Sequence, residues 1–167
     1  MAADGQFSSI SPAIRRQWDA ETFYDAAWTE AEARVEDWWS LEQLATLPAG
    51  FQAVMLWARV NGEVLNGGFT QLFFNGGVEA TAELRTYIKR AGLDAATKIL
   101  DRALDVERAR HTASGVRPGD MESGQYRKSE AGVAIEQCSA EWYQIEGACF
   151  QWLMKYLQSH PRLFNEG

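Results

Sequence analysis

The sequence has few of the residue types that build metal and disulfide sites. Among 167 residues there are two cysteines, Cys138 and Cys149, and two histidines, and no Cys-x-x-Cys pair or Cys/His cluster occurs. This scarcity argues against a disulfide framework and against the common zinc sites. Because both cysteines lie in a segment with a helical pattern, we expect them to be small core residues. No metal and no cofactor is predicted.

Long apolar runs and a basic leader are also absent. No window approaches the ~18 apolar residues of a membrane span. The first residues, Met-Ala-Ala-Asp-Gly-Gln, lack the basic and apolar regions of a signal peptide. We therefore expect no membrane association, and the sequence predicts a reduced, cytoplasmic protein.

Catalytic motifs are missing too. The chain contains none of the patterns H-E-x-x-H, G-x-S-x-G, G-x-x-x-x-G-K-S/T and G-x-G-x-x-G, which mark zinc, acyl-transfer and nucleotide chemistry. His111 and His160 have no carboxylate at a catalytic or metal-ligand spacing, so we expect both on the surface. The sequence predicts no catalytic residue and favours a protein that is not an enzyme.

What the sequence does have is apolar residues at helical spacing along most of its length. The clearest stripe is formed by Tyr24, Trp28, Ala31, Val35 and Trp38. Further helices are predicted at 12–18, from Pro48 onward, at 78–91, at 94–108 and at 142–156. No strand alternation persists. The prediction is one all-α domain spanning residues 1–167, a single compact bundle of about six to eight helices.

Two segments of this domain are predicted to be flexible. Residues 1–10 form a polar leader ahead of the first helix. Residues 111–129 are rich in Gly, Ser, Arg and Pro and contain few apolar residues. We expect this second segment to be a long, mobile loop.

The stretch from Glu63 to Asn75 combines apolar residues with a glycine pair and four polar side chains. These polar side chains are Glu63, Asn66, Gln71 and Asn75. Buried without partners, each would be costly, so they should form a hydrogen-bonded network or face a cleft. We expect a helix that ends or kinks at Gly67–Gly68, although Asn61-Gly62 also fits a type I′ hairpin turn. The interpretation we favour is a hydrogen-bonded bend.

Charge is unevenly distributed along the chain. The net charge is -7, from 16 Lys plus Arg and 23 Asp plus Glu, which disfavours direct binding to nucleic acid. Residues 17–47 contain eight acids and one base, whereas residues 85–128 contain ten bases and six acids. On a helical wheel, one acidic sector beside the aromatic stripe is formed by Glu21, Asp25, Glu32 and Glu36.

The motif Glu-x-x-Asn-Gly-Gly-Phe-x-Gln-x-Phe-x-Asn, here Glu63 to Asn75, resembles the signature of the DNA-mimic protein family, small acidic all-helical bacterial proteins. The resemblance extends from about Leu47 through the helix after Asp94 and includes the tail from Tyr156 to Phe164. It implies a helical protein, a homodimer in the named member, that occupies the DNA-binding face of a regulatory or nucleoid protein.

These observations favour a non-enzymatic protein-binding module whose acidic face, Glu21, Asp25, Glu32 and Glu36, engages a basic partner, with a DNA-binding protein as one such partner. Two alternatives stay open. One is an immunity-like or antitoxin-like inhibitor of a basic toxin. The other is a small enzyme or ligand-binding domain that uses the polar cluster Glu63, Asn66, Gln71 and Asn75.

Overall fold

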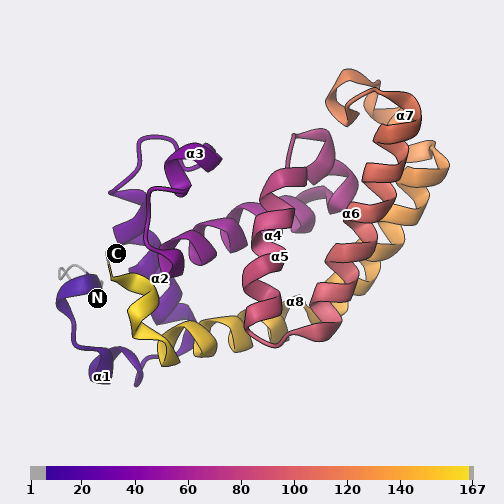
Figure 1. The fold of residues 1–167 in the computed structure, drawn as a ribbon. Helices are drawn as coiled ribbons and strands as arrows, with labels where there is room; N and C mark the ends of the chain where they lie inside the picture. Colours follow the sequence, from indigo (N-terminus) through magenta and orange to yellow (C-terminus); the bar gives the residue numbers. More distant parts are fainter. Residues whose placement is uncertain (1–6, 166–167) are drawn as a thin grey trace. The chain divides into compact units, whose positions relative to one another are not determined.

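The computed structural model describes residues 7–165, and every regular element in this range is helical (Figure 1). The α-helices are α1 (Pro12–Arg15), α2 (Ala20–Glu32), α3 (Leu41–Leu44), α4 (Ala49–Phe74), α5 (Val78–Arg90), α6 (Asp94–Ser114), α7 (Ser123–Lys128) and α8 (Glu130–Ser159). Three 3-10 helices are η1 (Phe7–Ser9), η2 (Pro118–Asp120) and η3 (Pro161–Phe164). The prediction of an all-α fold is confirmed.

The chain divides into two compact units. We call Met1–Ala58 with Phe150–Gly167 the terminal unit, and Arg59–Cys149 the central unit. The long helices α4 and α8 contribute residues to both units. The single domain expected for residues 1–167 stays a prediction.

The terminal unit is built around a cluster of aromatic rings. The Phe7 ring lies 5.2 Å from that of Phe23, 5.6 Å from that of Phe51 and 4.8 Å from that of Phe164. Phe7 is only 1% exposed and belongs to this core, whereas Ser8 and Ser9 are exposed. The flexible leader predicted for residues 1–10 therefore does not include Phe7. Residues 1–6 of that leader lie outside the described residues.

Helix α2 is shorter than its apolar stripe predicts. It begins at Ala20, where the Asp19 side chain accepts a hydrogen bond from the Thr22 amide, and it ends at Glu32. The last turn of α2 contains acidic residues and no basic residue, and negative charge at this end interacts unfavourably with the helix dipole. The amides of Glu36 and Asp37 instead donate to the Gln43 side chain at 2.8 and 2.9 Å. The helix predicted through Trp38 is therefore wrong beyond Glu32.

Helix α4 follows the prediction from Pro48 to the glycine pair. It continues through Asn61 and Gly62, which excludes the hairpin alternative. At Gly67–Gly68 the backbone leaves helical geometry, with φ +78° and ψ 176° at Gly68. The prediction of a kink at this pair is confirmed.

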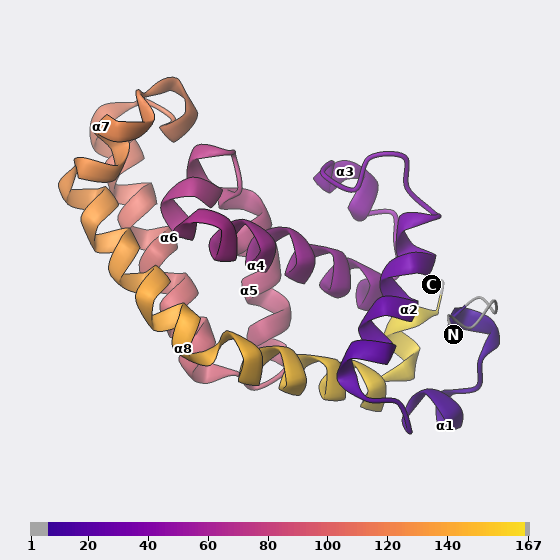
Figure 2. The same ribbon diagram turned by 180° about the vertical axis from the view of Figure 1, so that it is seen from behind.

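In the central unit, α5 and α6 pack side by side (Figures 1 and 2). Helix α6 runs to Ser114 and ends at Gly115, whose left-handed φ of +69° caps it. After it come η2 and α7, so helices occupy much of the segment that was predicted to be a loop over residues 111–129. Composition misled here because buried Pro118 and Tyr126, which fix this segment, are two apolar side chains among many polar ones.

Helix α8 extends the predicted 142–156 helix in both directions and passes through Gly147. The two cysteines it carries are free thiols and both are buried, as expected for core residues. None of the helices in the described range is both long and apolar enough to cross a membrane.

Candidate functional site

Three of the four acids predicted to form a face do so on α2. Glu21, Asp25 and Glu32 are exposed and lie at i, i+4 and i+11 of the same helix. Glu36 is also exposed, but it follows the end of α2, so its place on the helical wheel was wrong. Glu21 accepts a hydrogen bond of 2.7 Å from the Gln151 side chain of α8.

A row of aromatic rings accompanies these acids. Tyr24 stacks on Trp28 at 6.3 Å between centroids, Trp28 meets Trp38 edge-on at 5.2 Å, and Trp38 lies 4.5 Å from Trp39. Trp39, at the end of the row, is 41% exposed. Burial raises the pKa of Tyr24 to about 12, with a smaller contribution from Asp25, so this phenol is neutral at physiological pH. The acids and this aromatic row together are here called the α2 face.

The electrostatics of α2 show that Glu32 is not placed for helix stability. It is the last residue of the helix, where the backbone dipole is negative. The neighbouring acid Glu30 differs, because it is buried and bound by the Ser8 amide at 2.8 Å and by Arg34 at 2.5 Å. These hydrogen bonds lower the pKa of Glu30 although burial acts in the opposite direction. Glu30 is thus structural, whereas Glu32 projects its charge into solvent.

The polar cluster of the motif lies around the kink in α4. Asn75 donates a hydrogen bond of 2.8 Å to Glu63, so one residue before the bend meets one after it. The Gln71 amide fills the space left by the missing side chain of Gly67, where a Cβ would lie 2.1 Å from its oxygen. Asn66 is exposed and is not drawn into this contact. The structure therefore brings Glu63 and Asn75 together, with Gln71 covering the bend.

Helix α8 supplies most of the groups that stabilise the kink. The Ser139 hydroxyl accepts from the Phe69 amide at 2.8 Å, and the Tyr143 hydroxyl donates to the Val64 carbonyl at 2.8 Å. The Thr70 hydroxyl donates to the Glu136 carboxylate. The first two contacts satisfy backbone groups that the bend removes from the α4 ladder, and the third gives the buried Thr70 hydroxyl a partner. The kink is a structural joint between α4 and α8 within the central unit.

Sequence reasoning missed these α8 partners and the end of the aromatic row. Ser139, Glu136 and Tyr143 are 66 to 79 residues from their partners in the chain, and no local spacing indicates such pairs. The adjacent pair Trp38-Trp39 did carry a signal, because consecutive residues of a regular element point in different directions and two such rings cannot both face one core.

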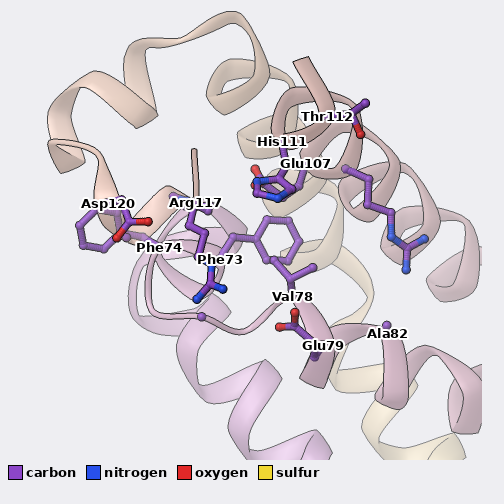
Figure 3. A pocket seen from close by; sticks show the side chains of 14 residues that line it. Phe73, Phe74, Val78, Glu79, Ala82, Glu107, His111, Thr112, Arg117 and Asp120 are labelled. Carbon is purple, nitrogen blue, oxygen red and sulfur yellow. The ribbon is translucent and has the colours of Figure 1, made fainter. Parts of the chain in front are cut away.

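Two pockets flank Phe74 at the end of α4. The smaller, about 370 Å³, touches the polar cluster through Gln71 and Asn75. The larger, about 770 Å³, lies between the start of α5, the end of α6 and η2 (Figure 3). No group of three or more His, Cys, Asp or Glu side chains within residues 7–165 is arranged to hold a metal ion.

A family model for DMP19-like proteins matches residues 45–160, well over half of the chain. The chain belongs to the DMP19-like protein family. Neither the curated proteins nor the solved structures contain a significant match. The resemblance to a DNA-mimic protein family is wrong, because the match is to DMP19-like proteins and nothing found supports a DNA-mimic family or motif.

The matched residues contain the kink and both pockets but not the α2 face. Glu63 to Asn75 and its α8 partners all lie within residues 45–160, whereas Glu21 to Trp39 precede them. The motif therefore belongs to the part of the fold that the family shares. The α2 face is carried by the part of the chain outside the match.

Proposed function

We propose that this chain is a non-enzymatic protein-binding module that holds a basic segment of a partner protein on its α2 face. The observation that carries the proposal is that exposed carboxylates of α2 lie beside the Trp28 ring, against which Trp38 packs. Asp25, Trp28 and Glu32 follow one another at i, i+3 and i+7, so they lie on the same side of α2. Trp38 and Trp39 extend that surface.

The chemistry of this surface favours arginine in the partner. A guanidinium can stack on an indole ring while it donates two hydrogen bonds to a carboxylate. Tryptophan and tyrosine rings also dominate the binding energy of many protein interfaces because they bury large areas at low entropic cost. The carboxylates contribute mainly to the association rate and to its sensitivity to salt.

The position of Glu32 supports binding over folding as the role of this acid. A carboxylate at the C-terminal end of a helix is unfavourable for the isolated helix. A cationic partner would reverse that effect by neutralising the charge. The charge of Glu32 would thus lower the stability of the helix in the free protein and raise the affinity for a cationic partner.

The test measures binding of a peptide of alternating arginine and serine by calorimetry. Asp25, Glu32 and Glu36 are changed together to lysine, which moves the net charge from -7 to -1 because each change adds two positive charges. We expect peptide binding to be lost, and binding by the unchanged protein to weaken as salt rises.

The matched control reverses three exposed acids of the central unit, Glu83, Glu122 and Glu130, with the same change in net charge. This variant should bind the peptide more tightly than the α2-face variant. Equal loss in both variants would show that only overall charge matters and would contradict the proposal.

Two further properties belong to the proposal. We place the interaction in the cytoplasm, which is consistent with two free, buried thiols. An inhibitor of a basic toxin is one form of this module, and identification of the partner distinguishes it from others. The homodimer implied at first by the motif stays a prediction.

A further inference from the structure

The larger pocket of the central unit has the size of a ligand site and does not belong to the α2 face. Its volume of about 770 Å³ falls in the range of small-molecule pockets. It is lined from four segments: the end of α4, the start of α5, the last turns of α6, and residues 117–120 (Figure 3).

The floor of this pocket is apolar and one of its charges is already neutralised. Phe73, Val78 and Pro118 provide apolar surface, and Phe74 closes one side. Glu107 lines the pocket but is 2% exposed, and it accepts hydrogen bonds from Arg110 at 2.7 and 2.9 Å and from Tyr126 at 2.8 Å. Glu107 is therefore a structural carboxylate and is not available to a ligand.

Two oppositely charged side chains, Arg117 and Glu79, line the pocket. Figure 3 shows the Arg117 guanidinium and the Glu79 carboxylate in the same part of the pocket, near Val78. Neither side chain forms an ion pair or hydrogen bond with any residue in the described part of the chain. A cation and an anion that face one space without meeting can each take one end of a molecule that carries both charges.

The backbone on both sides of Arg117 is fixed. The carbonyl of Val116 accepts a hydrogen bond of 2.8 Å from Arg110 and lies 3.2 Å from Nδ1 of His111. Pro118 is buried, and a Cβ on Gly119 would lie 2.9 Å from the Phe74 carbonyl, so this turn sits tightly against the end of α4. The backbone that carries Arg117 is thus fixed before any ligand arrives, which lowers the entropic cost of ordering this turn on binding.

We propose that this pocket binds a zwitterionic amino acid with an apolar side chain. The Arg117 guanidinium donates two hydrogen bonds to the ligand carboxylate, and the Glu79 carboxylate accepts from the ligand ammonium group. The apolar side chain packs against Phe74 and Val78. Asp120, which also lines the pocket, adds a second carboxylate near Phe74.

The test compares three probes that share one ring: L-phenylalanine, 3-phenylpropanoate, which lacks the ammonium group, and phenethylamine, which lacks the carboxylate. Binding to the full chain is followed by NMR chemical shifts. We expect L-phenylalanine to bind about tenfold more tightly than either analogue, because each lost charge pair lowers affinity by about this factor. The shifted amides should include those of Val78, Thr112 and Gly119.

Two variants assign the charges. Arg117→Gln should abolish the preference for L-phenylalanine over phenethylamine, and Glu79→Gln should abolish its preference over 3-phenylpropanoate. Arg90→Gln and Glu83→Gln are the controls, since both residues are exposed on α5 and outside the pocket. They should keep both preferences.

Three results would overturn the proposal: an analogue that binds as tightly as L-phenylalanine, equal effects in the control variants, or no binding of L-phenylalanine by a folded protein. The two proposals fail independently, because the α2 face and this pocket share no residue and are tested with different probes.

Discussion

At the scale of single residues, Gly68 is a position where the fold requires glycine. Its φ of +78° with ψ of 176° lies in a region that only glycine occupies readily. A Cβ there would also lie 2.8 Å from both carboxylate oxygens of Glu136 and 2.9 Å from the Ser139 hydroxyl. The second glycine of the pair is thus required by its backbone and by the close approach of α8.

We predict that Gly68→Ala lowers the free energy of unfolding by at least about 1–3 kcal/mol, the usual cost of such a backbone conformation. The measurement is urea denaturation followed by circular dichroism. The control is Gly62→Ala in the same helix, where a Cβ meets nothing within 4 Å. There alanine should stabilise by about 0.5–1 kcal/mol because it favours helix. Destabilisation by both changes would refute the special role of Gly68.

The Cys149 thiol is predicted to be unreactive in the folded protein. Burial raises its pKa to about 11, with a smaller contribution from Glu146, and the side chain is 4% exposed. In a Cys138→Ala variant, iodoacetamide at mildly alkaline pH should label Cys149 only after unfolding. Equal labelling rates with and without urea would show that the thiol is accessible.

The raised pKa of Cys149 also makes the stability of the protein depend on pH. The folded state disfavours the thiolate, so the contribution of Cys149 to stability is complete below the pKa of the unfolded chain. It is lost as pH rises toward about 11, the pKa in the folded state.

At the scale of elements, the kinked α4 depends on side chains of α8. The Phe69 amide has left the helical ladder and donates to the buried hydroxyl of Ser139. We predict that Ser139→Ala lowers the free energy of unfolding by about 1–3 kcal/mol, because a buried amide loses its partner.

A matched change at the exposed Ser159 provides the comparison. Its hydroxyl donates to the Tyr156 carbonyl near the end of the same helix α8. Ser159→Ala should alter stability by less than Ser139→Ala in the same thermal or urea titration. If the two variants are equally stable, α8 does not support the kink.

The helices also show which features of the fold could be predicted from the sequence. The apolar stripe after Pro48 and the pair Gly67–Gly68 predicted α4 and its kink, because both signals are local. The stripe through Trp38 predicted too long a helix, because Trp38 packs on Trp28 of α2 from the segment that follows the end of that helix, and Trp39 packs on Trp38. Spacing alone cannot separate rings on one helix from rings brought together by a turn.

The prediction of a loop over residues 111–129 was wrong for a different reason. Gly115 ends α6, and the carbonyl of Val116 is then bound by Arg110, a side chain of the preceding helix. Tyr126 anchors α7 through Glu107, nineteen residues earlier. A polar composition predicts a loop, but here the polar side chains themselves hold the chain in place.

At the scale of the whole molecule, the two proposed sites draw on segments of opposite charge balance. We expect these two sites to act independently. The acid-rich residues 17–47 carry the α2 face, and the base-rich residues 85–128 contribute Arg117 and part of the lining of the pocket. The sequence predicted the first surface through its acids and aromatic residues. It could not predict the second, since a pocket formed by the ends of several helices has no local pattern.

The most direct test of the central claim is affinity capture from a cell extract at low and at high salt. The unchanged protein, the α2-face variant and the matched control variant are compared, and captured proteins are identified by mass spectrometry. We predict that the unchanged protein and the control retain the same basic proteins at low salt, and that the α2-face variant loses them. Retention of those proteins by the α2-face variant would contradict the proposed function.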